Sequence, residues 1–281
     1  MTRKTGISVL AACVVFFTGS VTAIAGPLED RVKSGQPIRI GFSNVPIYAF
    51  PDDKGQAKGF ANVIALGILK DMGITNVETT VTDWGGLIPG LQANRYDIVT
   101  GGMSILGSRC KNVSFSDPIA KAGDGLLVPK GNPKGIHNYK DILNKQAMFV
   151  TYSGANLVEA ARKEGVADDQ IMQVPGPSEV LAAVKSGRVD VGGMTYFEVK
   201  SMADASHGEL EATNPADLPE WTQNWVGLAF RSEDEDFLAR FNASLKKYIG
   251  SPEMIGAVKE YGYSEANLPG PTTTQWVCAN R

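Results

Sequence analysis

Hydrophobic and polar positions follow two alternating patterns along the chain, and these predict strands and helices in turn. Residues 37–42 and 77–81 are predicted to be strands, and between them apolar residues recur every three or four positions over 60–72, as in an amphipathic helix. A helix at 87–93 and a strand at 97–100 follow. Strands that alternate with helices indicate a parallel sheet covered by helices, so the expected fold class is α/β.

The alternation starts again near residue 148. Further strands are expected at 149–152, 171–174 and 189–192, and further helices at 156–163, 179–185, 237–249 and 253–261. A local sequence also recurs, because residues 91–98 and 184–191 each read as a helix end followed by Arg-x-Asp and a strand. A common helix-to-strand turn explains this repeat as well as a duplication does. It favours two similar α/β lobes over one continuous sheet.

Two apolar strands are expected to connect the lobes, one leaving at 125–128 and one returning at 226–230. Lobe one then comprises 26–127 and 228–281, and lobe two is the inserted segment 128–227. Because the chain crosses between the lobes twice, the crossing is expected to act as a hinge. A cleft between hinged lobes is a common place for a small ligand.

The first 25 residues have the pattern of a cleavable secretory signal. Two basic residues at positions 3 and 4 precede an apolar run over 7–17, and small residues at 23–25 follow. The alternative, a membrane anchor, needs about 20 apolar residues, more than this run has. Cleavage is expected between Ala25 and Gly26, and the mature protein is expected outside the cytoplasm.

The cysteines change the picture once the signal is removed. Cys13 ends a Leu-Ala-Ala-Cys segment similar to a lipoprotein cleavage site, but the apolar run continues beyond it, so a lipoprotein is not expected. Cys110 and Cys278 then remain. Two cysteines in an oxidising compartment favour a structural disulfide, with two buried free thiols as the alternative.

Charge and composition exclude several classes of protein. The 281 residues hold 27 Lys and Arg against 30 Asp and Glu, and neither sign forms long runs. Loss of Arg3 and Lys4 with the signal changes the net charge from −3 to −5. Nothing here indicates a nucleic-acid or polybasic membrane surface, and a disordered, coiled-coil or collagen-like chain is excluded.

Chemistry typical of enzymes and metal proteins is missing from the sequence. The two histidines, His137 and His207, lie in polar, loop-like stretches and are expected on the surface. No zinc-protease, nucleophile-elbow, phosphate-loop or dinucleotide motif occurs, and no cofactor or metal is expected. The acidic run at 233–236 precedes a helix and is interpreted as charge that favours the helix dipole.

Several motifs together resemble one known family. They are Ile-Gly-Phe at 40–42, Asp-Trp-Gly-Gly-Leu-Ile-Pro-Gly-Leu at 83–91, the stretch 97–104 through Arg109, and Ser-Phe-Ser-Asp-Pro at 114–118. In order, they resemble the periplasmic solute-binding proteins of polar amino acid and compatible-solute ABC importers, bacterial extracellular solute-binding protein family 3. The resemblance implies a two-lobed, type II binding protein, expected to be monomeric, that captures one small solute and hands it to an inner-membrane permease.

The motifs are most similar to those of ectoine and hydroxyectoine binders. The features that carry this closer resemblance are Arg109-Cys110 with a C-terminal Cys278, residues 88–93, and the segments 130–133 and 139–142. An ectoine-like or betaine-like zwitterion, or a polar amino acid, is therefore the expected ligand.

The resemblance assigns the ligand's carboxylate to Arg109, whose planar guanidinium can bond both oxygens. Ser104 and the backbone near Gly102 and Met103 are expected to add hydrogen bonds. In lobe two, the segment with Ser153, Gly154 and Asn156 opens a helix whose N–H groups can receive an anion.

Tyr48 and Trp84 fall at the family's two aromatic contact positions, where a cation can rest on the ring faces. Amino acid binders carry an aspartate where this chain has Thr195, so the cleft is expected to lack an acid for a primary ammonium. Ectoine binders also tend to use an acid near the first strand and a third aromatic, and the matching positions here are Val45 and Ser104.

Two other functions fit the same scaffold. Some periplasmic dehydratases of cyclohexadienyl acids resemble these binders, but a dehydratase needs an acid or base in the cleft, and the expected cleft residues include none. A ligand-sensing domain would use the same contacts.

Overall fold

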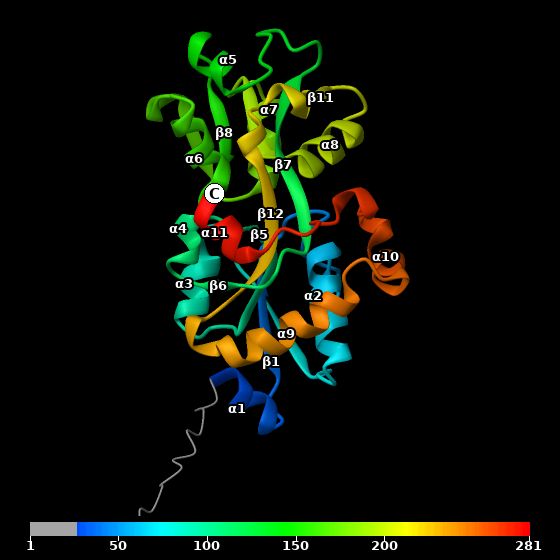
Figure 1. Ribbon diagram of the computed structural model, residues 1–281. Helices are drawn as coiled ribbons and strands as arrows, with labels where there is room; N and C mark the ends of the chain where they lie inside the picture. Colours follow the sequence, from blue (N-terminus) through cyan, green and yellow to red (C-terminus); the bar gives the residue numbers. More distant parts are fainter. Residues whose placement is uncertain (1–26) are drawn as a thin grey trace, which may run out of the picture.

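The computed structural model describes residues 27–281, which form two α/β lobes stacked one above the other in Figure 1. The predicted signal sequence at 1–25 lies outside the described residues. Within 27–281, no helix has the length and apolar character needed to cross a membrane.

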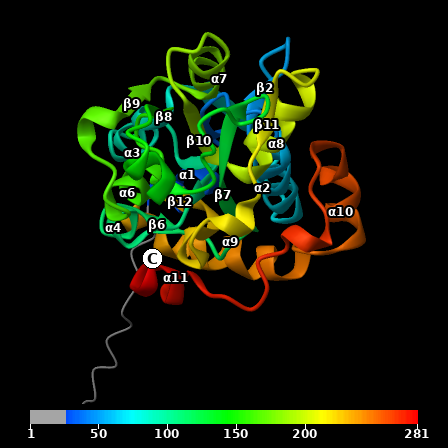
Figure 2. The same ribbon diagram turned by 90° about the horizontal axis from the view of Figure 1, so that it is seen from above.

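Lobe one is built on three parallel strands in the order β4-β1-β5, as the alternating pattern predicts. The strands of this lobe are β1 (Ile38–Phe42), β4 (Val77–Val81), β5 (Ile98–Ser104) and the short β2 (Phe50–Pro51), β3 (Ala57–Lys58) and β6 (Ser114–Phe115). Its helices are α1 (Pro27–Lys33), α2 (Phe60–Asp71), α3 (Leu87–Gln92), α4 (Gly107–Cys110), α9 (Glu235–Tyr248), α10 (Pro252–Val258) and α11 (Thr274–Asn280). Seen from above, α10 and α11 lie well apart (Figure 2).

Lobe two repeats the arrangement with three parallel strands in the order β10-β8-β9. Its strands are β8 (Phe149–Tyr152), β9 (Ile171–Val174), β10 (Val191–Thr195) and the short β11 (Leu210–Ala212). Its helices are α5 (Tyr139–Asn144), α6 (Asn156–Lys163), α7 (Pro177–Lys185) and α8 (Tyr196–Ala205).

Two long antiparallel strands, β7 (Ala120–Pro129) and β12 (Gln223–Phe230), join the lobes (Figure 1). The first part of β7 pairs with β12, and from Asp124 onward β7 pairs with β10 of lobe two. Asp124 therefore lies where the strand changes sheets. The expected lobe boundaries at 127/128 and 227/228 fall inside these strands and stay a prediction.

Most predicted elements occur at or within a few residues of the expected positions, and two differences matter. β10 begins at Val191 and continues through Thr195, and α8 follows without a loop. The sequence analysis predicted no helix there. The acidic run at 233–236 does more than favour a helix dipole, because Asp234 is fully buried and its carboxylate accepts a hydrogen bond from the Leu28 N–H at 2.9 Å.

The repeated Arg-x-Asp sequence marks the same turn in both lobes. Each helix ends on a residue with positive φ, Asn94 in one lobe and Gly187 in the other, as is common at helix C-termini. Each aspartate carboxylate then accepts the backbone N–H at the start of its lobe's first strand. Asp97 bonds Arg39 N at 2.9 Å, and Asp190 bonds Met148 N at 2.7 Å.

The lobe-one aspartate differs because it is fully buried among arginines. Asp97 accepts hydrogen bonds from Arg39 Nε at 3.0 Å and Nη2 at 2.7 Å, and Arg231 Nη2 lies 3.2 Å away. Burial by itself would raise the pKa of Asp97, but the bonds and charge of Arg39 and the charge of Arg231 outweigh it and lower the pKa.

We expect Asp97→Asn to destabilise the protein far more than Asp190→Asn does. Loss of a buried charge that pairs with arginines costs about 3–5 kcal/mol, whereas a partly exposed aspartate that bonds one N–H and one lysine is worth about 1 kcal/mol. Urea denaturation of the two variants measures both costs.

The lowered pKa of Asp97 also determines the pH range in which its contribution to the free energy of unfolding is lost. The folded state keeps Asp97 ionised, so its contribution is present above the ordinary aspartate pKa of about 4 and is lost as the pH falls further. Equal losses of unfolding free energy in Asp97→Asn and Asp190→Asn would contradict the role assigned to Asp97.

Candidate functional site

A small cavity lies between the lobes at the carboxyl ends of the parallel strands. It contains about 240 Å³ of space not filled by protein atoms, of which only about 10 Å³ can take the centre of a water-sized sphere. That is room for about one water molecule, so a solute can enter only if the lobes move apart. The residues that line it are Val45, Tyr48, Trp84, Gly102, Ser104, Tyr152, Asn156, Thr195 and Glu198.

Tyr48 comes from the loop between β1 and β2 and is held by the start of α2. The N–H groups of Phe60 and Ala61, which have no partner within the helix, donate to the carbonyls of Ile47 and Tyr48 at 2.9 Å. The Tyr48 ring packs on Phe60 with 4.6 Å between centroids. Its hydroxyl is buried and makes no hydrogen bond of good geometry; burial raises its pKa, although nearby Thr195 acts to lower it. An aromatic face and a hydroxyl thus border the cavity.

Trp84 lies in a single turn directly after β4 and reaches across to lobe two. Its Nε1–H donates to the carbonyl of Gly154 at 3.2 Å, and its ring meets that of Tyr152 edge to face at 5.5 Å. The structure therefore brings both predicted aromatics to the cavity and adds a third, Tyr152, from the other lobe.

The end of β5 forms the floor of the cavity on the lobe-one side. Gly102 has φ +71°, and a side chain there would come within 2.8 Å of the Tyr48 ring, so glycine is required. The predicted residues Gly102 and Ser104 line the cavity, whereas the Met103 side chain is buried in the core.

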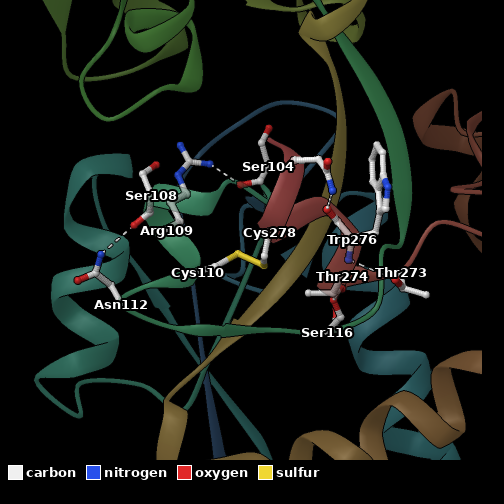
Figure 3. Close-up of a disulfide and its surroundings, with 11 residues drawn as sticks. Ser104, Ser108, Arg109, Cys110, Asn112, Ser116, Thr273, Thr274, Trp276 and Cys278 are labelled. Atoms are coloured by element: carbon white, nitrogen blue, oxygen red, sulfur yellow. Dashed lines mark hydrogen bonds between the residues drawn. A yellow bond between two sulfur atoms is a disulfide. The ribbon is translucent and has the colours of Figure 1, made fainter.

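Arg109 is buried beside the cavity and is not among the described residues that line it. Its Nη1 donates to the Ser104 carbonyl at 2.7 Å (Figure 3), and its Nη2 donates to the Gly154 carbonyl of lobe two at 2.8 Å. Burial lowers its pKa to about 10, against the attraction of Glu159 and Tyr152. The guanidinium therefore stays charged near neutral pH and bridges the two lobes.

The start of α6 differs from the expected anion-binding segment. Ser153 is exposed, and its N–H donates to the Val174 carbonyl at 2.9 Å, so this N–H is already used. The carbonyl of Gly154 points toward lobe one and accepts hydrogen bonds from both Trp84 and Arg109. Of this predicted segment, only Asn156 lines the cavity.

Asn156 is oriented by a buried acid at the junction of the sheets. Its Nδ2 donates to Asp124 Oδ1 at 2.8 Å, while the hydroxyl of Tyr139 donates to Asp124 Oδ2 at 2.8 Å. Burial raises the pKa of Asp124 to about 7, although both bonds act to lower it. The Asp124 carboxylate thus holds the side-chain amide of Asn156 in place.

The sequence analysis was wrong that the cleft lacks an acid, because Glu198 supplies one. Thr195 caps α8, and its N–H and Oγ1 donate to Glu198 Oε2 at 3.0 and 2.6 Å. The other oxygen, Oε1, is buried at the cavity, and no donor meets it with hydrogen-bond geometry. Burial raises the pKa of Glu198 to about 7, although the Thr195 bonds and the nearby Tyr152 hydroxyl act to lower it.

A signal for this residue was present in the sequence. Thr195-x-x-Glu198 has the spacing of a capping box, in which a threonine and a glutamate three residues later cap a helix reciprocally. A helix predicted to start after Thr195 would have turned Glu198 back toward the end of β10. Similarly, Tyr152 is the last residue of a strand that was predicted correctly.

The comparisons with known proteins agree with this architecture. The model of bacterial extracellular solute-binding proteins, family 3, matches residues 38–263. A probable amino-acid ABC transporter periplasmic-binding protein of Sinorhizobium fredii is 31% identical over 98% of this chain and 93% of its own length.

Solved structures show the same two-lobed fold. The crystal structure of EhuB in complex with hydroxyectoine superposes with a TM-score of 0.81 at 29% identity, over 91% of this chain and 98% of that one. An ancestral amino acid-binding protein, described as a precursor of cyclohexadienyl dehydratase, superposes with a TM-score of 0.69 at 28% identity, over 83% of this chain and 96% of that one. The chain therefore belongs to the bacterial extracellular solute-binding proteins, family 3.

Proposed function

We propose that this protein is the periplasmic solute-binding component of an ABC importer, and that its cavity takes a small zwitterion with a carboxylate and a nitrogen cation that carries N–H. The observation that carries the proposal is the buried carboxylate of Glu198, whose Oε1 faces the cavity without a partner. The family membership and the similarity to an amino-acid transporter component support the transport role.

The cationic end of the solute would lie between Glu198 and the aromatic rings. A buried carboxylate oxygen without a hydrogen bond is costly, and an N–H donor on a cation would satisfy it and attract its charge. The faces of Tyr48, Trp84 and Tyr152 would add cation–π attraction, on the order of 2 kcal/mol when desolvated.

The carboxylate end of the solute would bind Arg109. The guanidinium now donates to the Gly154 carbonyl, a neutral acceptor. A carboxylate is a stronger acceptor than a carbonyl and can take two parallel N–H bonds from one guanidinium. Exchange of the Gly154 carbonyl for the carboxylate would therefore be favourable, and Ser104 and Asn156 would offer further donors.

Glu198 disfavours the betaines that the sequence analysis included among the expected ligands. A fully methylated nitrogen has no N–H to give to Oε1, whereas a primary or secondary ammonium and the ring cation of ectoine do. We therefore propose ectoine-like solutes and small polar amino acids as the ligand class, which is consistent with the similarity to the hydroxyectoine-bound structure.

A second candidate function, a cyclohexadienyl-type dehydratase, gains one supporting observation. A general acid works best with a pKa near the working pH, and the pKa of Glu198 is raised to about 7. Binding is favoured because the relatives named above are binding proteins. Incubation of the protein with prephenate and arogenate separates the functions, since turnover lost in Glu198→Gln would establish the enzyme.

Thermal shift against ectoine, hydroxyectoine, glycine betaine and the twenty amino acids tests the proposed function. A ligand at one hundred times its Kd stabilises the folded state by about 2.7 kcal/mol, so a binder raises the melting temperature clearly. Arg109→Ala should abolish the shift, because the carboxylate loses its main partner. A shift that survives in Arg109→Ala, or none with any zwitterion, would contradict the proposal.

A matched pair of ligands tests the requirement for N–H. Proline and N,N-dimethylproline share a skeleton and a carboxylate, but only proline can donate to Glu198. If the cavity admits proline, we expect calorimetry to show at least tenfold weaker binding of the dimethyl compound, from the loss of about 1.4 kcal/mol or more. Glu198→Gln should remove most of this preference. Equal affinities in the wild-type protein would exclude the role of Glu198.

The affinity should also depend on pH through Glu198. A cationic ligand binds the ionised carboxylate, so affinity is expected to be full above a pH of about 7 and to fall as the medium becomes more acidic. Asp124 titrates in the same range, and it is present in both the wild-type protein and Glu198→Gln. The difference between their calorimetric pH profiles therefore isolates Glu198, and identical profiles would contradict the assignment.

A further inference from the structure

The C-terminal helix α11 lies directly against α4, the single turn that carries Arg109 (Figure 3). We infer that α11 and the disulfide that joins it to α4 position Arg109 for the solute, so that the C-terminus of the chain sets the affinity of the site. The inference rests on the proposed function, in which Arg109 binds the carboxylate.

Helix α11 holds α4 at both ends. At the first residue of α4, the Gly107 N–H donates to the Arg281 carbonyl at 2.8 Å. At its last residue, Cys110 forms a disulfide with Cys278, and their Cα atoms are 5.9 Å apart. A side chain at position 107 would come within 2.8 Å of the Cys278 carbonyl. Glycine is therefore what allows the two backbones to approach so closely.

The turn depends on such support because it is too short to be stable alone. Its four residues form one helical turn, and isolated helices need at least about 12 residues to be even marginally stable in water. The Arg109 guanidinium has one bond within its own lobe, to the Ser104 carbonyl, and one to Gly154 in lobe two. The second bond is the one that a bound carboxylate would replace. The position of Arg109 would then rest on Ser104 and on α11.

Helix α11 is itself fixed to the strands that join the lobes. The Trp276 ring meets that of Trp225 in β12 edge to face at 5.5 Å, and the Arg281 guanidinium lies over the same Trp225 ring at 5.4 Å. Thr274 Oγ1 donates to the Ser116 carbonyl at 2.6 Å. The loop before α4 is tied to the same strand, since Ile105 N donates to the Trp225 carbonyl at 2.8 Å. The position of Arg109 is thus linked, through α11, to β12, one of the two strands that join the lobes.

The test compares the affinity of the best zwitterion from the thermal-shift panel for four proteins. They are wild type, Cys110→Ser/Cys278→Ser, Arg109→Lys, and the combination of all three substitutions. Calorimetry well below each melting temperature should show roughly tenfold weaker binding when the disulfide is removed from the wild type. Removal from Arg109→Lys should cost little, because lysine cannot keep the two-pronged geometry. Reduction of purified wild-type protein should reproduce the loss without any substitution.

A purely structural disulfide predicts a different result. It would lower the melting temperature and leave the affinity unchanged, or would weaken binding equally in the wild-type and Arg109→Lys backgrounds, and either outcome overturns the inference. Asp97→Asn is the control, since it destabilises lobe one away from Arg109 and should leave the affinity unchanged. If the wild-type protein binds no zwitterion, the proposed function itself fails, and the inference fails with it.

Discussion

The structure depends on the pairing of β7 and β12, the two strands that pass from one lobe to the other. Because β7 changes its partner from β12 to β10 at Asp124, the lobes are joined by continuous backbone and cannot separate, yet each keeps its own parallel sheet. Asp124, buried at the change of sheets, bonds Asn156 and so connects the hinge with the wall of the cavity.

The two lobes supply complementary chemistry to the cavity. Lobe one lines it with the rings of Tyr48 and Trp84 and buries the guanidinium of Arg109 beside it, while lobe two brings the carboxylate of Glu198 and the ring of Tyr152. The Gly154 carbonyl accepts from both Trp84 and Arg109, so one neutral acceptor of lobe two holds two side chains of lobe one. A zwitterion would replace these contacts with charged ones at both ends. This explains why a chain with nearly balanced charge needs no large electrostatic field of either sign.

Much of the fold follows from local patterns in the sequence. The strands at 77–81, 149–152 and 171–174 lie as predicted, because short runs rich in β-branched and apolar residues between turn residues specify them locally. The repeated Arg-x-Asp sequence has a physical basis, since each aspartate caps the first strand of its lobe. Pairing between distant strands, such as β12 with both β5 and β7, depends on tertiary contacts and could not be predicted from these patterns.

The site was predicted less completely than the fold. Lining residues such as Tyr48, Trp84 and Asn156 were identified through the family resemblance. Glu198 was missed because the family acid was sought at position 195, whereas this chain caps α8 with Thr195 and places the carboxylate one turn later. The position of Ser153 was also wrong for an anion site, because its N–H is used by Val174. Which backbone N–H groups are already hydrogen-bonded cannot be predicted from residue types.

The central claim is that one solute joins Arg109 of lobe one to Glu198 of lobe two. A crystal structure of the complex with the tightest-binding zwitterion tests it most directly. The account predicts the ligand carboxylate on the Arg109 guanidinium in place of the Gly154 carbonyl, and a ligand N–H within hydrogen-bond distance of Glu198 Oε1. A bound ligand that leaves Glu198 Oε1 without a partner, or that leaves Arg109 bonded to Gly154, would contradict it.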